Sequence, residues 1–339
     1  MVEGGLAASE SWPWVGWRQP WCPPSECSSL SPVPMTQSRP KKYPLRGVVV
    51  SLNTPYDDAG AVDLDALARL VDWHIGQGAA GFLAPAYAGE VYDLSFSERL
   101  EIYRCVRAAS AGRAELFAGA TAREEEASLR AAAEATRAGA DGVLLEVPLD
   151  LKGRNAEILA YFKRVGEIGM PVLMIQDWDG SGPGMDVSLV RELFETIPAF
   201  RCLKVEVQPA GPKYSAVIEA TGGRLHVSGG WAAGQMLEAL DRGVDAFMPT
   251  AMTGLYRRVF DCWHRGERDE AREVFAKMLP VLAFTHQHLD VSIHFYKRLF
   301  HRRGIFRTAR TRRPRAAYDA HHERQGEWLI DYLDRIEGA

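Results

Sequence analysis

The stretch RCLKVEV, residues 201–207, has the alternation of side chains expected for a β-strand. One face of this strand carries Lys204 with Cys202 and Glu206, while the other face carries Leu203, Val205 and Val207. The pattern therefore places a primary amine inside an apolar framework. Desolvation lowers the pKa of a lysine ammonium and so produces a nucleophilic amine, which can form a Schiff base with a carbonyl substrate. The alternative is a lysine that snorkels to water at a strand end or pairs structurally with Glu206.

Short apolar runs like this one recur from residue 46 onward and alternate with longer amphipathic segments. The predicted strands are Gly47–Leu52, Gly81–Ala84, Glu115–Gly119, Gly142–Val147, Val172–Gln176, Arg201–Glu206, Leu225–Ser228 and Ala246–Pro249. The predicted helices between them are Asp63–Gln77, Ser95–Ala109, Arg123–Ala138, Asn155–Ile168, Asp186–Thr196, Gly211–Thr221 and Trp231–Arg242. Strands that alternate with helices are typical of parallel sheets with crossover helices. Eight such units in roughly 200 residues favour an α/β fold of the TIM (β/α)8 barrel type, and no glycine-rich nucleotide fingerprint follows the first strand.

Three regions are expected along the chain. Residues 1–40 hold four tryptophans among proline, serine and glycine without periodicity, which indicates a disordered or non-native extension, with translation beginning at Met35. The alternative is a tryptophan-bearing arm that docks on a partner subunit. The barrel is assigned to residues 41–252. Helical patterns at Leu255–Arg265, Glu267–Phe300 and Ala316–Ile336 predict a C-terminal helical region over residues 253–339, which serves as a cap or as an oligomer surface.

Composition narrows the class of protein. The chain has 339 residues, of which 47% are hydrophobic, and a formal charge of −4. These values suit one large soluble domain or two small ones and give no sign of a nucleic-acid or membrane partner. The five cysteines lack metal-ligand spacing, so a reducing cytoplasm and no metal are expected. The arginine-rich run Lys297–Arg315 is interrupted by apolar residues at helical spacing, which predicts a solvated face and subunit contact.

Several motifs occur in order along the chain. They are Ser51-Leu52-Asn53-Thr54-Pro55, Ala88-Gly89-Glu90 with Leu94-Ser95, Ala118-Gly119-Ala120, Leu203-Lys204-Val205-Glu206, Ser228-Gly229-Gly230, Tyr296-Lys297-Arg298 and Arg313-Pro314. In this set the chain resembles the dihydrodipicolinate synthase and N-acetylneuraminate lyase family of class I aldolases, from about Tyr43 to Tyr332. The resemblance implies a barrel with a helical C-terminal domain, a homodimer or homotetramer, and an imine between Lys204 and pyruvate or another 2-oxo acid. It implies no cofactor.

The resemblance also implies a carboxylate-binding turn after the second strand, which here reads Ala86-Tyr87-Ala88-Gly89-Glu90. Gly89 and Glu90 match the family's turn, but its two threonines are replaced by Tyr87 and Ala88. The hydroxyl contact is therefore lost at Ala88, and the phenol of Tyr87 either replaces it or packs at the barrel mouth.

Three departures concern the family's proton transfer and substrate binding. The tyrosine at the end of the fifth strand is replaced by Ile175 or Gln176, depending on the alignment, with Asp177 beside it. The Pro-Tyr-Tyr after the fourth strand is replaced by Pro148-Leu149-Asp150, and the arginine after the fifth strand is missing. We therefore expect the chain not to be a true dihydrodipicolinate synthase.

The remaining site residues are expected near Lys204. Glu206 either holds the amine or exchanges a proton with it, or forms only a structural pair. Gly229 lets the backbone approach a ligand, and Phe247 lies where the family has an apolar side chain beside the 2-oxo acid, but both can equally be core and turn residues. Lys213, at a predicted helix start, is expected to face solvent, with an anionic group as the alternative. The candidates for the general base are, in falling order, Glu206, Asp150, Asp177 and Tyr87, and the alternative is a substrate carboxylate or an ordered water.

These features predict a cytoplasmic lyase that performs aldol cleavage or condensation on a small 2-oxo acid through Lys204. Two alternatives stay open. One is a sugar-acid dehydratase that uses the same lysine, and the other is a catalytically impaired family member that binds a 2-oxo acid.

Overall fold

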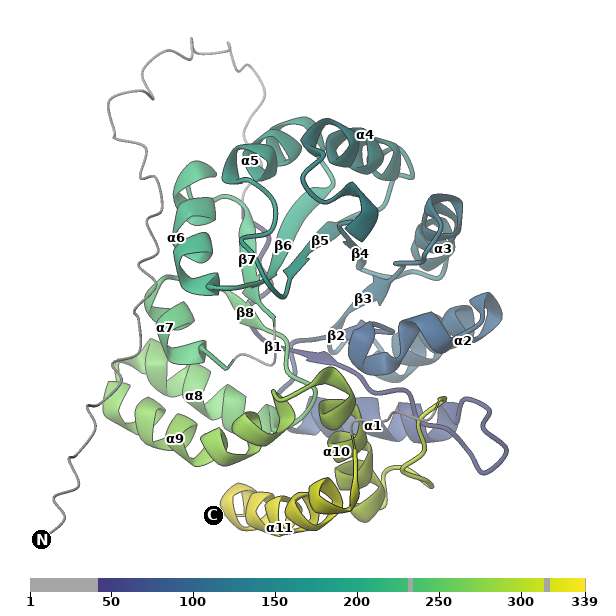
Figure 1. Cartoon of the computed structure of the whole chain (residues 1–339), viewed down its shortest axis with the longest axis vertical. Helices are drawn as coiled ribbons and strands as arrows, with labels where there is room; N and C mark the ends of the chain where they lie inside the picture. The colour runs from purple at the N-terminus through teal and green to yellow at the C-terminus, as the bar shows by residue number, and fades with distance from the viewer. Residues whose placement is uncertain (1–41, 231–233, 314–317, 339) are drawn as a thin grey trace, which may run out of the picture. The chain divides into compact units, whose positions relative to one another are not determined.

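Eight parallel strands close into a barrel in chain order, and the last strand pairs with the first (Figure 1). The computed structural model describes residues 42–230, 234–313 and 318–338. The strands are β1 (Gly47–Ser51), β2 (Gly81–Ala84), β3 (Glu115–Gly119), β4 (Gly142–Glu146), β5 (Leu173–Asp179), β6 (Phe200–Val207), β7 (His226–Gly229) and β8 (Ala246–Phe247). The predicted TIM barrel is confirmed.

Helices surround the barrel because each carries one apolar face that packs on the sheet. They are α1 (Leu64–Gly76), α2 (Phe96–Ser110), α3 (Glu125–Arg137), α4 (Asn155–Gly166), α5 (Val187–Thr196), α6 (Ala210–Ala220), α7 (Met236–Asp241) and α8 (Thr253–Arg265). Short 3₁₀ turns follow β2 (η2, Tyr87–Gly89; η3, Val91–Asp93) and β4 (η4, Leu149–Leu151). Local sequence fixes several helix starts: Ser95 and Glu98, for example, form a capping box at α2.

Alternate residues of the strands form two separate cores. The inward-facing side chains fill the barrel interior and include Val49, Leu83, Phe117, Leu144, Met174, Cys202 and Ala246. The outward-facing side chains pack against the helices, and Leu203, Val205 and Val207 of β6 belong to this second core. The predicted division of the 201–207 stretch between two faces is confirmed, so Lys204 belongs to the inward row.

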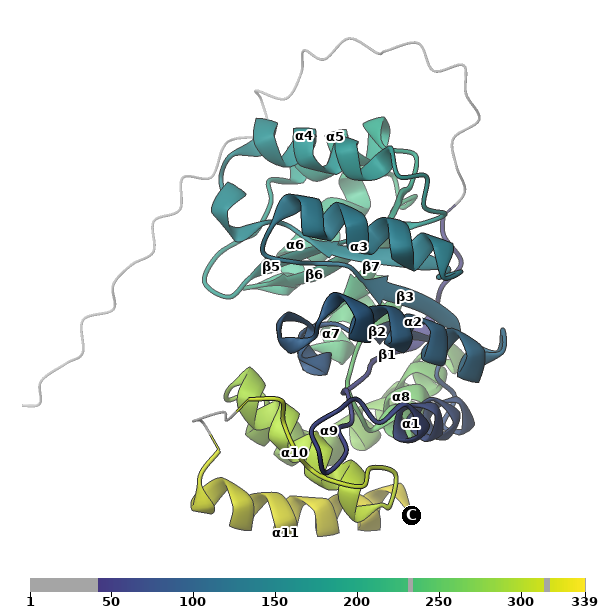
Figure 2. The same cartoon turned by 90° about the vertical axis from the view of Figure 1, so that its right-hand side faces the viewer.

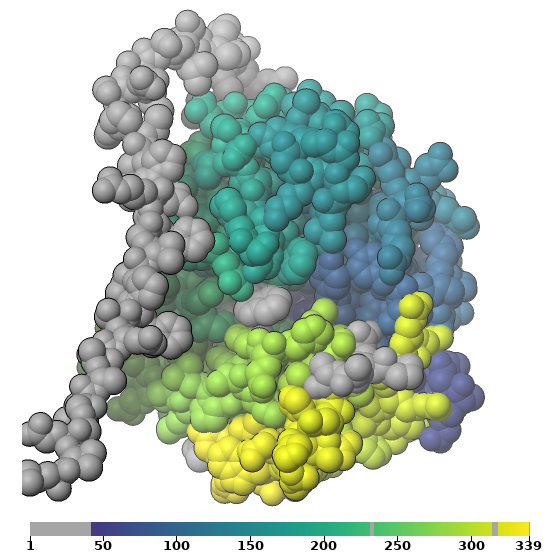
Figure 3. Space-filling view, viewed as in Figure 1, coloured from purple at the N-terminus to yellow at the C-terminus, as the bar shows by residue number. Residues whose placement is uncertain are grey.

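A C-terminal helical region follows the barrel and consists of α9 (Arg268–Thr285), α10 (Leu289–Arg302) and α11 (Ala320–Glu337). Figures 2 and 3 show these helices gathered against one side of the barrel. The single helical pattern predicted for Glu267–Phe300 is wrong, because the chain turns between Thr285 and Leu289. His288 caps the second helix there by accepting a hydrogen bond from the backbone N–H of Asp290 at 3.1 Å. The predicted patterns gave no signal for this turn.

The regions differ in part from those predicted. Residues 41–339 form one compact unit, and α8, which the sequence assigned to the C-terminal region, packs against β1 as the eighth helix of the barrel. The prediction for residues 1–40 lies outside the described residues. Among the described residues, every helix is too short or too polar to cross a lipid bilayer.

Candidate active site

Lys204 lies near the C-terminal end of β6, in a row of inward-facing residues from neighbouring strands. Strand register places it beside Gln176 of β5, which in turn lies beside Glu146 of β4. On the other side Lys204 is paired with Ser228 of β7. Only 5% of Lys204 is exposed. The C-terminal ends of barrel strands are where active sites of this fold lie, so this row marks the candidate site.

Glu206 forms an ion pair with Lys204, with 3.1 Å between Glu206 Oε1 and Lys204 Nζ. The other carboxylate oxygen, Oε2, accepts a hydrogen bond from the side-chain amide of Gln176. Gly230 makes room for this carboxylate, because a Cβ at Gly230 would lie 2.1 Å from Glu206 Cγ. The arrangement aims one oxygen of Glu206 at the amine and fixes the other.

Glu146 is a buried carboxylate that the sequence analysis missed. The hydroxyl of Tyr87 donates a hydrogen bond to Glu146 Oε1, and the hydroxyl of Tyr92 donates one to Oε2 at 3.0 Å. Burial raises the pKa of Glu146 above its ordinary value, and the charge of Glu206 raises it further, whereas the two tyrosine hydroxyls and Lys204 lower it. Strand alternation contained the signal, because Glu146 shares the inward face of β4 with Leu144.

The turn after β2 is held by the segment that follows β1. The side-chain amide of Asn53 donates to the carbonyl of Ala88 at 2.6 Å, and the hydroxyl of Thr54 donates to the carbonyl of Gly89 at 2.7 Å. A Cβ at Gly89 would lie 2.9 Å from the carbonyl oxygen of Leu52, so this close approach requires glycine. Tyr87 and Ala88 face the cavity described below, and Gly89 packs beneath them.

Glu90 points into a buried ion network instead of the cavity. It has a left-handed backbone with φ of 58°, and its carboxylate pairs with Lys297 of α10 and accepts a hydrogen bond from the backbone N–H of Arg312 at 2.8 Å. Lys297 also donates to the carbonyl of Arg310 at 2.8 Å and lies 4.2 Å from the centre of the Tyr56 ring. The solvated face predicted for the basic run is therefore wrong for Lys297, which is fully buried.

A cavity of about 420 Å³ opens above Lys204. Apolar and aromatic side chains make up much of its wall, and the polar groups come from the strand ends and from the turn between α9 and α10. The lining residues are Ser51, Tyr87, Ala88, Leu149, Gln176, Trp178, Lys204, Glu206, Met248, Thr250, Thr285, His286, Gln287, His288, Leu289, Asp290 and Ser292. Lys204 is the one lysine or arginine in this lining of described residues.

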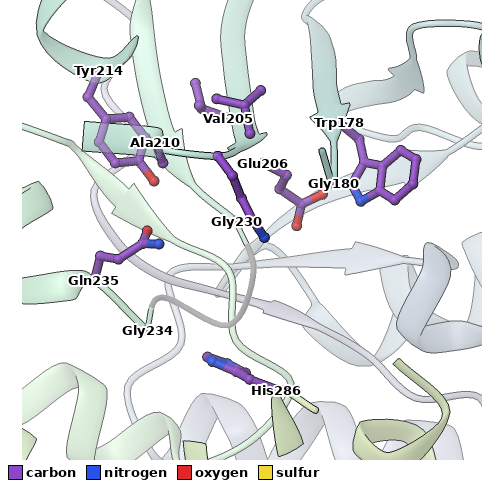
Figure 4. Close-up of a pocket in the computed structure, with 12 residues that line it drawn as sticks. Trp178, Gly180, Val205, Glu206, Ala210, Tyr214, Gly230, Gly234, Gln235 and His286 are labelled. Atoms are coloured by element: carbon purple, nitrogen blue, oxygen red, sulfur yellow. The ribbon is translucent and has the colours of Figure 1, made fainter. Parts of the chain in front are cut away.

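A smaller cavity of about 200 Å³ adjoins the first and shares Trp178, Glu206 and His286 with it. Figure 4 shows these three side chains directed toward the same space, with Tyr214 and Gln235 at its other side. Burial lowers the pKa of His286, which favours a neutral imidazole in this wall. The two cavities together give room for a substrate longer than a three-carbon acid.

Asp177 lies outside the cavity, although the sequence placed it among the site residues, and Lys213 is buried instead of facing solvent. Asp177 takes the outward face of β5 and forms an ion pair with Lys213 at 3.1 Å. Lys213 is buried and also donates to the carbonyls of Pro183 and Met185. The reason is that β5 continues to Asp179 instead of ending at Gln176, so successive side chains alternate and Trp178 faces the cavity.

Three further expected residues also lie elsewhere. Phe247 faces outward and packs against Phe260 of α8, while Met248 lines the cavity in its place. Asp150 lies on η4 with its side chain 80% exposed and pairs with Arg154. Gly229 has Tyr214 and Phe247 as its nearest neighbours, and it is the next residue, Gly230, that contacts Glu206. For Phe247 and Gly229, the predicted position is one residue away from the residue that lies at the site. A shift of one residue along a strand moves a side chain to the opposite face of the sheet.

One group of potential metal ligands occurs among the described residues, formed by Cys262, Glu267 and Glu270. Glu267 pairs with Arg265 at 2.6 Å and Glu270 with Arg258 at 3.0 Å. Both carboxylates are thus neutralised by arginines, and the group is explained as surface ion pairs.

Comparisons with known proteins agree with this architecture. The model of the dihydrodipicolinate synthetase family matches residues 44–331. A 4-hydroxy-tetrahydrodipicolinate synthase of Pelobacter propionicus is 27% identical over 241 residues, which cover 70% of this chain and 81% of that protein. The enzyme of that name from Laribacter hongkongensis is 35% identical over 131 residues, or 38% of this chain and 45% of the relative.

Solved structures show the same fold. The dihydrodipicolinate synthase from Rhodopseudomonas palustris has a TM-score of 0.78 at 22% identity and covers 87% of this chain and 100% of its own. The dihydrodipicolinate synthase from Aquifex aeolicus has a TM-score of 0.76 at 20% identity, with coverage of 85% and 98%. At these identities the likeness concerns the fold alone.

Proposed function

Because the chain belongs to the dihydrodipicolinate synthetase family, we propose that it is a lyase in which Lys204 forms a Schiff base with a 2-oxo acid. The observation that carries the proposal is the position of Lys204, which is buried at the C-terminal end of β6, opens on a cavity of about 420 Å³ and has a carboxylate 3.1 Å from its nitrogen. An amine in this place can attack a bound carbonyl directly.

In the proposed chemistry, Lys204 supplies the nitrogen of the imine and Glu206 accepts its proton. Glu206 accepts a proton from the ammonium, and the free amine adds to C2 of the 2-oxo acid. Loss of water then leaves a protonated imine. That cation withdraws electrons from C3 and stabilises the enamine formed when a bond to C3 breaks. Gln176 keeps Glu206 aligned throughout by its hydrogen bond to the second oxygen.

Borohydride trapping tests this proposal. Purified protein is incubated with pyruvate and then with a panel of larger 2-oxo acids, and each mixture is reduced and digested. The peptide that contains Lys204 is expected to gain the mass of the reduced adduct. If protein shown to be folded by circular dichroism yields no adduct with any 2-oxo acid, the lyase proposal fails and a protein that only binds the acid becomes the better explanation.

A sugar-acid dehydratase is the second candidate. It is favoured by the smaller cavity, where Tyr214, Gln235 and His286 supply polar groups for a hydroxylated chain. Product analysis separates the candidates, since cleavage gives two carbonyl compounds and dehydration gives one larger 2-oxo acid.

We further propose that the aldehyde partner is uncharged, so that the chain differs from a true dihydrodipicolinate synthase. Glu206 and Asp290 lie in the described cavity wall, where Lys204 is the one lysine or arginine, and a second substrate carboxylate would be desolvated without a partner. The synthase names of its relatives stand against this proposal.

A pair of aldehydes of equal length tests the selectivity. With pyruvate as donor, kcat/KM for butanal is expected to exceed that for succinic semialdehyde by roughly 10- to 100-fold, because the carboxylate loses its hydration without a partner. The aldehyde used by the synthases is measured alongside. A preference for either carboxylate-bearing aldehyde would refute the proposal.

Gly230 gives a further prediction, because a side chain there would displace the carboxylate that faces Lys204. Gly230→Ala is expected to lower kcat by roughly 100-fold, the usual cost of a misplacement of about 1 Å in a reacting group. Gly229→Ala is the matched control, since its Cβ would lie 3.2 Å from the nearest atom, the hydroxyl of Tyr214. Equal activity of the two variants would show that the position of Glu206 is unimportant.

We also propose a compartment and an assembly for this protein. Cys105, Cys202 and Cys262 are free thiols in the described structure, which supports a reducing cytoplasm. Trp328 and Leu279 are exposed on the C-terminal helices, which supports a homo-oligomer that covers them. Light scattering of the purified protein measures its mass against the 37.6 kDa of one chain.

A further inference from the structure

The step that breaks the carbon–carbon bond needs a proton-transfer group other than the one that serves imine formation. Glu206 and Gln176 serve the nitrogen of Lys204, and cleavage also requires a group that takes the proton of the substrate hydroxyl and later protonates C3. Asp177 cannot do this work, because its side chain faces away from the cavity and pairs with Lys213. The group must therefore come from another part of the cavity wall.

Tyr87 and Glu146 have the required geometry. Tyr87 lines the cavity that holds Lys204, and its hydroxyl donates to the carboxylate of Glu146 behind it. Glu146 is 3% exposed and lies in the same inward row as Lys204, one strand beyond Gln176. Since neighbouring strands are about 4.8 Å apart, the backbone positions of Glu146 and Lys204 are separated by roughly 10 Å. A small bound acid spans that gap.

The charges around this pair decide which group gains and loses the proton. Two carboxylates, Glu146 and Glu206, share one ammonium, and Glu206 contacts it directly. The partners of Glu146 are neutral hydroxyls, and burial raises its pKa. The same burial and the Glu146 charge raise the pKa of Tyr87 far above its ordinary value and that of Tyr92 to about 12. The tyrosines therefore keep their protons and donate, and the carboxylate of Glu146 accepts a hydrogen bond from each of them.

Other titratable groups face the pair from each neighbouring element. They are Tyr92 on η3, Tyr161 on α4, and Lys204 and Glu206 on β6, with Arg99 of α2 beside Tyr92. Burial raises the pKa of Tyr161 to about 12. Within this set, Glu146 is the carboxylate that accepts the hydrogen bond of the Tyr87 hydroxyl.

We propose that Tyr87 and Glu146 form the proton relay of the carbon–carbon bond step, with the Tyr87 hydroxyl facing the substrate and the Glu146 carboxylate storing the proton. The inference rests on the proposed function. It assigns Tyr87 as the catalytic residue and Glu146 as the acceptor that acts through it.

The step is balanced in the cleavage direction. A 4-hydroxy-2-oxo acid is bound as its protonated imine on Lys204. The proton of the 4-hydroxyl passes to the oxygen of Tyr87 while the Tyr87 proton passes to Glu146. The C3–C4 bond breaks, its electron pair forms a C2–C3 double bond, the C2–N π pair moves to nitrogen, and the aldehyde leaves. The relay then reverses, and C3 of the enamine receives the proton. Water finally hydrolyses the imine of the shorter 2-oxo acid.

Hydrogen–deuterium exchange at C3 of pyruvate tests the relay without an aldehyde. Exchange of the methyl protons in D₂O is followed by NMR, and imine formation is measured in parallel by borohydride trapping. Glu146→Gln and Tyr87→Phe are expected to trap pyruvate on Lys204 as the wild-type protein does, but to slow exchange by at least ~100-fold, the usual contribution of a general acid–base. Exchange within about threefold of the wild-type rate, with the adduct intact, would overturn the relay.

The chain supplies a matched control at the other end of the barrel. Tyr43 donates a hydrogen bond of 2.6 Å to the half-buried Glu115, whose pKa burial also raises. Glu115→Gln and Tyr43→Phe change the same chemical groups outside the cavity and are expected to leave exchange unchanged. If they slow exchange as much as the relay variants do, the effect is structural and the relay is refuted.

The pH profile separates the relay from a structural role. Ionised Glu146 is the acceptor, so the exchange rate should rise with pH through a pKa above the ordinary 4.5. In Glu146→Gln this rise of the exchange rate with pH should be absent. Because the folded state binds this proton more tightly than the unfolded state, Glu146 favours folding at low pH and this contribution falls as pH rises above about 4.5. The neutral variant is therefore expected to fold. A wild-type protein that forms no adduct would refute the proposed function itself, and the relay with it.

Discussion

Replacing Lys204 with methionine should remove the borohydride-trapped adduct completely and lower kcat/KM by on the order of 10⁴- to 10⁶-fold, because a covalent mechanism loses its nucleophile. No other lysine or arginine among the described residues lines the cavity, so none is placed to take over. The adduct is measured by the mass of the peptide and the activity by release of the 2-oxo acid. Residual cleavage within 100-fold of the wild-type rate would contradict imine catalysis.

Two variants separate the loss of the nucleophile from a loss of folding. Methionine at position 204 removes the ammonium that pairs with the buried carboxylate of Glu206, which destabilises the site. Lys204→Arg keeps a positive charge beside Glu206 but cannot form an imine, so it should be equally inactive and more stable. Lys163→Met, at an exposed position of α4, is the control for the substitution itself and should retain full activity.

Replacing Lys297 with methionine is expected to lower the free energy of unfolding by about 3–5 kcal/mol, because it removes one partner of a buried ion pair with the carboxylate of Glu90. The side chains of Lys297 and Glu90 are both 0% exposed, so water cannot replace the lost partner. The measurement is urea unfolding at one fixed protein concentration, which keeps any contribution from subunit association constant.

A double variant tests the cause of this loss. Glu90→Gln with Lys297→Met removes both charges and is expected to recover much of the stability, since an unpaired buried charge costs more than an absent pair. Arg191→Met breaks the exposed pair with Glu195 and should cost less than about 1 kcal/mol. A loss of similar size at positions 297 and 191 would show that burial of the Glu90 pair is unimportant.

The network around Glu90 also connects the C-terminal region to the cavity. Glu90 directly follows the η2 turn that carries Tyr87, and its partners Lys297 and Arg312 belong to the C-terminal part of the chain. No local pattern predicts this connection, because residues more than 200 positions apart meet only after the barrel has closed. The basic run looked like a solvated face for the same reason.

The sequence by itself determined the elements and their order. Short apolar runs predicted all eight strands, and their separation by amphipathic helices predicted the closed parallel barrel that the structure contains. The alternation of side chains in residues 201–207 placed Lys204 and Glu206 on one face of β6, where their charged atoms lie 3.1 Å apart. These properties depend on neighbours in the chain, since strand period and helix period are local features.

Only the tertiary structure decided which inward residues meet. The register between β4, β5 and β6 places Glu146, Gln176 and Lys204 in one row, and the extension of β5 turns Asp177 outward to Lys213. A shift of one residue exchanged Phe247 for Met248 at the cavity. The register between strands and the position of each strand end depend on packing between segments that are distant in the sequence. The local alternation of side chains does not determine them, because it is compatible with more than one register.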